Sequence, residues 1–329
     1  MLSPTLFSIY MDELLKTLRN KGLGCQVSGV WMGSTGYADD LVLLAPGRET
    51  MAKMLKICEE YGIEHNLVFS TDENPVKSKS KCIYMCGKSG NNLPGNLPVP
   101  LQLYGKDLPW VVSAVHLGHH LHQSCTMDQD VKIKRAQFID NSLEIRDIFH
   151  FALPSQVLQA VQLYSLHCYG SMLWDFGGVM TGQFSRAWNT CVKLVHGVPR
   201  STHTYMVENL LASDFIPVMT ELYARYAKFS KSLMKSVCFE VRYLVNIIKK
   251  DIQSTIGGNL YRIQSETGLN PLKISPKVIR ASPVLSAVPI QDQWRLPVLN
   301  KWLQQRQELE SDLQDTKYIQ MLIDAICSG

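Results

Sequence analysis

The chain has 329 residues, a formal net charge of +4 and 46% hydrophobic residues. This composition supplies enough apolar material for a core in about two structural units, and so small a positive charge permits a nucleic-acid partner without requiring one. No apolar stretch is long enough to span a membrane, and the N-terminus lacks the basic start and apolar core of a signal peptide. We therefore expect a soluble intracellular protein, in the nucleus or the cytoplasm.

The first expected element is a helix close to the N-terminus. Ser3 is suited to its N-cap and Pro4 to its first helical position, where a missing N–H group costs nothing. An apolar stripe with spacings of three and four residues follows, formed by Phe7, Tyr10, Leu14 and Leu18. Gly22 marks the expected end of this helix.

The tetrad Tyr37-Ala38-Asp39-Asp40 lies between two apolar segments, residues 30–36 and 41–45. Polar residues between apolar runs predict a β-hairpin with mostly buried strands and the carboxylates at its tip. Mg²⁺ prefers carboxylate oxygens and commonly bridges one or two of them to substrate phosphates, so Asp39 and Asp40 are candidate metal ligands. The alternative is an ordinary hairpin turn, because aspartate is frequent in turns.

Helical and extended segments are expected to alternate after this hairpin. In order, the pattern predicts a helix over residues 50–65, a strand over 67–69, a strand over 82–86, a surface loop over 87–100, and a hairpin of 101–104 with 109–117 that turns at 105–107. The helix is amphipathic, since Met51, Met54, Leu55 and Cys58 recur three and four residues apart. A basic run over residues 77–81 precedes the second strand.

The rest of the chain is predicted to be mostly helical. Thr126 is suited to cap a helix that runs toward Phe149, with Asp128 and Asp130 favourable in its first turn. Further helices are expected over residues 154–169 and 183–196, within 200–270, and from about 299 to 326. Residues 271–300 contain repeated Pro and Ser and are interpreted as a linker.

Cysteine and histidine usage gives little sign of a structural metal or of disulfides. Nine cysteines are dispersed without a Cys-x-x-Cys pair, so we expect reduced thiols. The densest group of possible ligands runs from His116 to Cys125, but its spacing fits none of the common zinc patterns. We interpret these histidines mainly as loop or surface residues, with metal binding as the less favoured alternative.

Basic residues recur along a predicted helix in the third quarter of the chain. At spacings of three, three, four and seven, they are Arg225, Lys228, Lys231, Lys235 and Arg242. This spacing predicts one helix face that could follow a phosphate backbone, with salt-sensitive binding. The alternative, which is favoured for an isolated basic face, is a solvated surface.

Taken together, several of these motifs resemble a known family. The order LSPTLF...Y, GYADDLVLL, a helix, NLVFS...KSKSKCIYM and VHLGHHL is similar to the second half of the reverse transcriptase domain of non-LTR (LINE-type) retrotransposons. The resemblance covers residues 2 to about 122. It implies an RNA-directed DNA polymerase, a nucleotidyltransferase that uses Mg²⁺, an RNA template, a DNA primer and deoxynucleoside triphosphates.

The resemblance also implies roles for individual residues. Asp39 matches the metal-ligating carboxylate and Asp40 the second carboxylate, while Tyr37 and Ala38 match the floor under the primer terminus. Ser3 and Pro4 belong to the motif that supports the template and the incoming nucleotide. Lys79 best matches the lysine that positions the triphosphate or protonates the pyrophosphate, with Lys77 and Lys81 as alternatives, and His116, Leu117 and Gly118 match the primer grip.

Some parts of the family pattern are missing from this sequence. The fingers, an earlier aspartate motif, the Gln-Gly before LSP and the usual endonuclease have no match, so we expect a truncated chain that lacks most polymerase activity on its own. The predicted architecture is α+β: a partial palm with an antiparallel sheet and two helices over residues 1–122, a helical thumb over 123–198, a helical connector over 199–270, and a linker with a C-terminal helix over 271–329. The alternatives are a non-catalytic nucleic-acid-binding remnant and a functionless truncated product.

Overall fold

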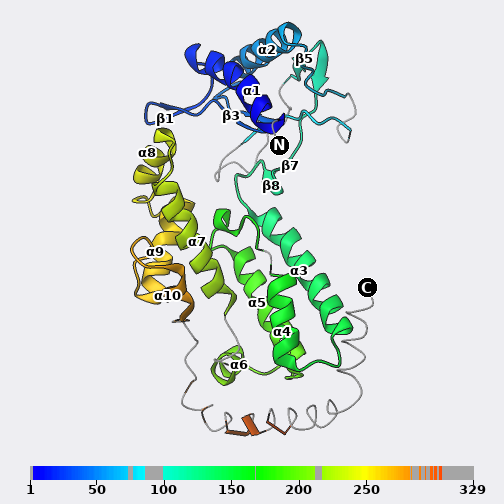
Figure 1. The fold of residues 1–329 in the computed structure, drawn as a ribbon, viewed down its shortest axis with the longest axis vertical. Coiled ribbons are helices and arrows are strands. Elements are labelled where there is room, and N and C mark those ends of the chain that lie inside the picture. Colours follow the sequence, from blue (N-terminus) through cyan, green and yellow to red (C-terminus); the bar gives the residue numbers. More distant parts are fainter. Residues whose placement is uncertain are drawn as a thin grey trace. The chain divides into compact units, whose positions relative to one another are not determined.

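The computed structural model describes residues 3–72, 77–85, 99–166, 168–211 and 217–281, together with scattered residues between 283 and 305. These residues form helices and small antiparallel sheets of two strands each (Figure 1), which confirms the predicted α+β class. None of the described helices combines the length with the hydropathy that a bilayer span demands.

The chain divides into two compact units. Unit 1 comprises Met1–Thr126 and Val237–Leu244, and unit 2 comprises Met127–Ser236 and Val245–Gly329. All four of the described sheets lie in unit 1, whereas the described part of unit 2 is helical.

Unit 1 combines helices with β-hairpins. Its elements are α1 (Ser3–Asn20), β1 (Gln26–Val27), β2 (Val30–Trp31), β3 (Ser34–Tyr37), β4 (Asp40–Leu43), α2 (Arg48–Glu64), β5 (Leu101–Leu103), β6 (Lys106–Leu108), β7 (Ser113–His116) and β8 (His119–His122). Each strand pairs only with its neighbour in sequence, β1 with β2, β3 with β4, β5 with β6 and β7 with β8. Each described sheet is therefore a hairpin of two strands joined by a short turn.

The core of unit 1 forms between α1 and α2. Leu14 and Leu18 of α1 and Met54 of α2 are fully buried, as the apolar stripes predict. Each buried side chain of this size contributes about 1.5–3 kcal/mol to folding. Met11, which is 5% exposed, completes the stripe in place of Tyr10, which is 39% exposed. The Tyr10 hydroxyl donates a hydrogen bond to a backbone carbonyl at the surface, so its ring cannot be turned fully inward.

Two predicted strands of unit 1 are not formed by the described residues. Residues 67–69 pair with no strand, and Val68 is 84% exposed. Cys82 makes only an isolated parallel bridge with Trp110, and residues 83–85 are irregular. Phe69 instead packs as a partly buried side chain against the core, so its apolar character serves packing without strand pairing. Residues 86–98 lie outside the described residues.

The hairpin after residue 100 turns earlier than predicted. The β5–β6 turn is Tyr104-Gly105, with φ values of 52° and 70°, and Lys106 already belongs to β6. Positive φ at both central residues is the pattern of a type I′ turn, whose twist matches that of a hairpin. The predicted partner strand is wrong: residues 101–103 pair with 106–108, whereas the segment 109–117 contains β7, which pairs with β8 instead.

Unit 2 is a set of helices around an aromatic core. Its elements are α3 (Asp128–Ile148), α4 (Pro154–Tyr164), the short 3₁₀ helix η1 (Ser171–Leu173), α5 (Val179–Val195), α6 (Thr204–Leu210), α7 (Val218–Met234), the C-terminal end of α8 (Phe239–Ile248) from Val245 on, α9 (Thr255–Thr267) and α10 (Pro276–Ala281). Helices α3, α4 and α5 pack on one another, and α7 packs against α5 and α10. Phe138, Trp174, Trp188 and Tyr226 are the largest buried side chains of this core.

The predicted helices of unit 2 exist, but their ends differ from the predictions. The N-cap of α3 is Met127, with no side-chain cap, and the Thr126 hydroxyl bonds to Ser124 instead. Asp128 and Asp130 do lie in the first turn. Helix α4 ends before residue 165 and α5 begins before residue 180, which reflects the weak definition of helix ends by periodicity alone.

Helix α10 lies inside the segment that was interpreted as a linker. Pro276 occupies its first position, where the missing N–H group is tolerated, and Ile279 is 1% exposed in the core against α7. The linker prediction is therefore wrong for residues 276–281. The helix predicted from about 299 to 326 lies largely outside the described residues.

Two carboxylates in unit 2 are held by cations. Asp130 is fully buried and accepts hydrogen bonds of 2.9 Å from Lys134 Nζ and from Trp174 Nε1. Glu221 of α7 binds Arg225 on its own helix and Arg280 on α10. Burial alone would raise the pKa of Glu221, but the hydrogen bonds from Arg280 and Arg225 outweigh burial and hold that pKa below its ordinary value.

Candidate functional site

The candidate metal ligands lie at the tip of the β3–β4 hairpin. Tyr37 pairs with Asp40, which leaves Ala38 and Asp39 as the two turn residues. Asp40 is the first residue of β4, and both carboxylate residues are exposed. The prediction that the two aspartates occupy an exposed hairpin turn is confirmed.

The turn differs from the other turns in unit 1. The turns Ser28-Gly29, Tyr104-Gly105 and Leu117-Gly118 have positive φ at both residues, with glycine second. In the β3–β4 turn only Ala38 has a positive φ, of 51°, a pattern typical of type II′ turns, which favour glycine at that position. A left-handed backbone at a residue with a side chain costs about 1–2 kcal/mol. Ser28, Tyr104 and Leu117 have positive φ values of the same size at their own turns, so the conformation of Ala38 marks a tight turn and is not by itself evidence of function.

Close backbone packing anchors the base of this hairpin. A Cβ atom on Gly24 would lie 2.3 Å from the Gly33 Cα atom, so the two backbones approach at a distance that only glycine allows. The Leu44 amide donates to the Gly33 carbonyl at 2.7 Å, and the Trp31 indole donates to the Leu23 carbonyl at 2.7 Å. The hairpin that presents the aspartates is therefore held at its base by a close backbone contact and by two hydrogen bonds.

The strands of the hairpin are less buried than predicted. Leu41, Val42 and Leu43 are half-buried, and Leu44 is 38% exposed. Leu41 and Leu43 pack against the α1–α2 core from its edge. Because β3 and β4 form a sheet of their own, no neighbouring described strand covers them.

Asp39 and Asp40 fit a Mg²⁺ site that is completed by a substrate. Among the described residues, no group of three or more His, Cys, Asp or Glu side chains is close enough to hold a metal ion. Mg²⁺ commonly takes only one or two protein carboxylates and fills its remaining positions with water and phosphate oxygens. Two exposed carboxylates suit that mode, but a site with two metal ions needs further ligands from outside the described residues.

The candidate lysines lie on an irregular segment that is held by Ser78. Ser78 is 2% exposed, and its hydroxyl donates to the Ser80 carbonyl and accepts from a backbone amide. Lys77, Lys79 and Lys81 are exposed and make no hydrogen bond or ion pair with any described residue. Their alternation with buried or half-buried serines points all three outward, and the structure does not distinguish among them.

The β7–β8 hairpin contains the predicted grip motif. His116 pairs with His119 across the Leu117-Gly118 turn, so the residues that match the family's primer-grip hairpin do form a hairpin, while their role as a primer grip stays a prediction. The His122 ring bonds to the Ser124 hydroxyl at 2.8 Å, which gives that histidine a local structural role.

The N-terminal motif residues Ser3 and Pro4 open α1. The helix as bounded begins at Ser3 itself, one residue earlier than a Ser3 cap would give, a difference within the usual uncertainty of helix ends. The role of both residues in supporting the template stays a prediction.

The basic stripe predicted for one helix face is interrupted. Helix α7 ends at Met234, Lys235 is its C-cap, and Arg242 lies in α8 within the segment assigned to unit 1. The prediction of one continuous helix face is therefore wrong. The break between the two helices could not be predicted, because no proline or glycine marks it and residue spacing alone does not reveal it.

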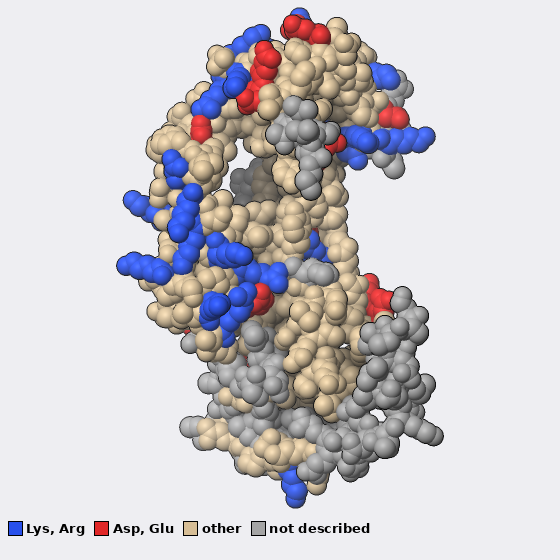
Figure 2. All heavy atoms as spheres, in the orientation of Figure 1, with Lys and Arg blue, Asp and Glu red and all other residues tan. Residues whose placement is uncertain are grey.

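Part of the stripe is also used inside unit 2. Arg225 pairs with Glu221, and the Lys231 ammonium donates to the Ile274 carbonyl. Lys228 and Lys235 remain exposed. Figure 2 shows other basic side chains gathered over the region of α7, α9 and α10, so this part of unit 2 presents positive charge from several helices.

Three residues that shape the candidate site were missed by the sequence analysis. Gly24 and Gly33 allow the close approach beneath the hairpin, and Ser78 fixes the lysine segment. A glycine at each end of the β1–β2 hairpin was the available signal for the first pair. Nothing in the sequence distinguishes Ser78 from the other serines of its segment.

Comparison with known proteins agrees with this geometry for the first part of the chain. Residues 1–85 match the family model described as Reverse transcriptase (RNA-dependent DNA polymerase), a segment that includes α1, the β3–β4 hairpin, α2 and the lysine segment. No curated protein matches the chain. The candidate metal hairpin thus lies within a segment that is similar to reverse transcriptases.

Proposed function

We propose that residues 1–85 provide the metal-binding hairpin of a reverse transcriptase palm of the non-LTR (LINE-type) kind. The reaction is the templated addition of a deoxynucleotide to the 3′ end of a primer. One observation supports this most: two adjacent exposed carboxylates lie at the tip of a β-hairpin, within the segment that matches the family model.

In this proposal each element has a limited task. Asp39 and Asp40 hold Mg²⁺ against the triphosphate, and the ion, when bound, stabilises the charge that develops during phosphoryl transfer. Lys79 neutralises or protonates the leaving pyrophosphate. Tyr37 and Ala38 support the primer terminus, and the β7–β8 turn holds the primer against an RNA template.

Asp39 and Asp40 would hold one metal ion, whose remaining positions would be filled by water and substrate oxygens. A second ion requires a further carboxylate, and no group of three or more possible ligands lies together among the described residues, so primer extension would test more than the Asp39 and Asp40 pair. A binding measurement is therefore a better first test than an activity assay.

The test uses Mn²⁺, which substitutes for Mg²⁺ and is followed by electron paramagnetic resonance. Full-length protein is titrated with Mn²⁺ with and without dTTP, beside the variants Asp39→Asn and Asp40→Asn. The control is Asp107→Asn, because Asp107 is an exposed aspartate on the neighbouring β5–β6 hairpin. An amide keeps the shape of the side chain but removes the charge that the ion requires.

We expect dTTP to tighten Mn²⁺ binding to the wild-type protein and to the Asp107→Asn variant. Asp39→Asn should weaken it by about tenfold or more, which corresponds to about 1.4 kcal/mol. Equal Mn²⁺ binding by the wild-type protein and all three variants would refute the assignment of the metal hairpin.

A second candidate function is duplex binding without catalysis, favoured by the exposed Lys228 and Lys235 and the surrounding basic surface. It predicts salt-sensitive binding of an RNA–DNA duplex that survives Asp39→Asn but is lost on Lys228→Glu and Lys235→Glu. Duplex binding that these charge reversals leave unchanged would exclude it.

A further inference from the structure

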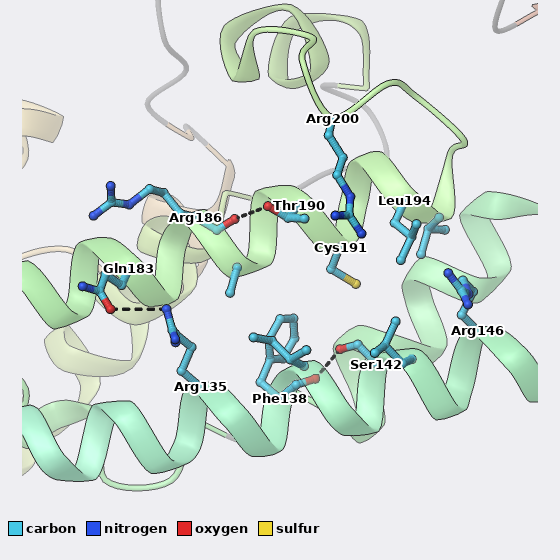
Figure 3. A pocket seen from close by; sticks show the side chains of 14 residues that line it. Arg135, Phe138, Ser142, Arg146, Gln183, Arg186, Thr190, Cys191, Leu194 and Arg200 are labelled. Carbon is cyan, nitrogen blue, oxygen red and sulfur yellow. Dashed lines mark hydrogen bonds between the residues drawn. The ribbon is translucent and has the colours of Figure 1, made fainter.

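A cavity of about 570 Å³ lies between α3 and α5 in unit 2 (Figure 3). Its walls are apolar where the two helices face each other. They are formed by Phe138, Ile139 and Leu143 of α3 and by Ala187, Cys191 and Leu194 of α5. The volume lies within the usual range of small-molecule sites, and such sites have mainly apolar walls with a few polar groups that fix orientation.

The apolar walls are open to solvent at the mouth of the cavity. Phe138 is 2% exposed and forms the floor, whereas Ile139 is 36% and Leu143 39% exposed. Leaving such side chains in water forgoes the stabilisation that burial of their surface would give. A ligand with a hydrocarbon part would cover them.

The charged residues that line the cavity are all basic. They are Arg135, Arg146, Arg186 and Arg200, and no aspartate or glutamate joins them. Arg135 donates to the Gln183 side chain, and Arg146 pairs with Asp147, an exposed residue outside the lining, so both are partly satisfied.

Arg186 and Arg200 differ from Arg135 and Arg146 in having no partner for their guanidinium groups among the described residues. Both are exposed, and neither guanidinium makes a hydrogen bond or ion pair with any described residue. In Figure 3 the Arg200 side chain extends across α5 toward the cavity beside Cys191, at the end where Arg146 approaches from α3. A guanidinium binds phosphate and carboxylate groups through paired N–H donors, so this end of the cavity suits an anionic head group.

We propose that this cavity binds one amphipathic anion, an alkyl chain with a phosphate or carboxylate head. The tail lies over Phe138 and against the open Ile139 and Leu143 side chains, and the head meets Arg200 and Arg146. The lining of α3 extends from residue 135 to 146, about 16 Å at the rise of an α-helix, which suits an extended chain. This site is separate from the proposed metal hairpin and does not depend on it.

A free molecule fits these features better than a larger partner. The cavity has the volume of a single small ligand, and its apolar floor offers nothing to the phosphate backbone of a nucleic acid. The open Ile139 and Leu143 side chains account for a tail, and the cationic rim accounts for the head.

Octyl phosphate is the probe, and isothermal titration calorimetry on the full chain is the measurement. Three related compounds separate the contributions of the head group and the tail to binding: octanol lacks the charge, inorganic phosphate lacks the tail, and octylammonium has the opposite charge. We expect octyl phosphate to bind at least tenfold more tightly than each of them.

Variants then locate the site. Arg200→Ala should weaken octyl phosphate binding by about tenfold while leaving octanol unchanged, since only the head loses a charge-assisted hydrogen bond. Leu143→Asn should weaken both ligands. Lys132→Ala is the control for the loss of a positive charge, because Lys132 is exposed on α3 and does not line the cavity. This variant should bind octyl phosphate as the wild-type protein does.

Several outcomes would overturn the proposal. Equal affinities for octanol and octyl phosphate would refute it, and so would unchanged octyl phosphate binding by a folded Arg200→Ala variant. Vesicles of anionic phospholipid or an RNA–DNA duplex form the remaining arm. Capture of either through Arg186 and Arg200, without octyl phosphate binding, would assign the arginines to a larger partner and refute the small-molecule site.

Discussion

Replacing Gly33 by alanine is expected to loosen the hairpin that presents Asp39 and Asp40. A Cβ atom at this position would lie 2.6 Å from the Leu23 carbonyl oxygen and 2.8 Å from the Trp31 ring. Neither neighbour can move independently, because the Trp31 indole donates its hydrogen bond to that same carbonyl at 2.7 Å. The substitution therefore displaces both groups.

The magnitude follows from two contributions. Forcing an extra carbon into a packed contact costs about 1–3 kcal/mol, and loss of the indole hydrogen bond adds about 1 kcal/mol. The expected loss of local stability is thus about 2–4 kcal/mol.

Gly36→Ala is the matched control on the same hairpin. Its Cβ atom would lie 3.5 Å from Leu15 Cδ1 and 3.9 Å from the Asp40 carbonyl oxygen, which are ordinary contacts. Because alanine restricts the unfolded chain, this variant should be neutral or more stable by about 0.4–1 kcal/mol.

Hydrogen exchange measured by mass spectrometry is the suitable assay, since a chain of two units need not unfold in a single transition. In peptides that cover residues 24–44, Gly33→Ala should exchange about 30- to 1,000-fold faster than wild type, the factor that corresponds to about 2–4 kcal/mol. Exchange in Gly33→Ala that is as slow as in Gly36→Ala would refute the close packing beneath the hairpin.

Two further predictions concern titratable groups. The pKa of Glu221 lies below its ordinary value of 4.5, so its ion pairs stabilise unit 2 above that pH, and this stability is lost as the pH falls through the lowered pKa. Acid titration of hydrogen exchange in α7 should show this loss, and Glu221→Gln should be less stable at neutral pH with a shallower acid response; identical acid responses would contradict the role of the pair. Burial raises the pKa of the Cys58 thiol to about 12, so iodoacetamide at mildly alkaline pH should modify the exposed Cys125 and Cys238 well before Cys58. Mass spectrometry that finds Cys58 modified first would show that the α1–α2 core is not packed as described.

The sequence predicts the candidate site better than it predicts the surrounding contacts. The exposed turn of Asp39 and Asp40 follows from polar residues between apolar runs, and the buried Leu14, Leu18 and Met54 follow from helical spacing. These features depend on local patterns that each segment contains by itself.

The errors arise where a partner far along the chain decides the outcome. Spacing alone cannot show that Tyr10 turns outward to a carbonyl at His65 or that Phe69 packs without strand pairing. The positive φ of Ala38 and the cavity between α3 and α5 are likewise properties of the folded backbone, which side-chain identity does not reveal.

The most direct test of the central proposal is to locate the bound metal. Fe²⁺ that replaces Mg²⁺ generates hydroxyl radicals with ascorbate and peroxide, and these radicals cut the backbone next to the ion. In the presence of dTTP, the proposal predicts cleavage within residues 37–41 in the wild-type protein and in Asp107→Asn, and its loss in Asp39→Asn. Cleavage at the histidines of the β7–β8 hairpin instead, or cleavage near the β3–β4 turn that Asp39→Asn leaves unchanged, would contradict it.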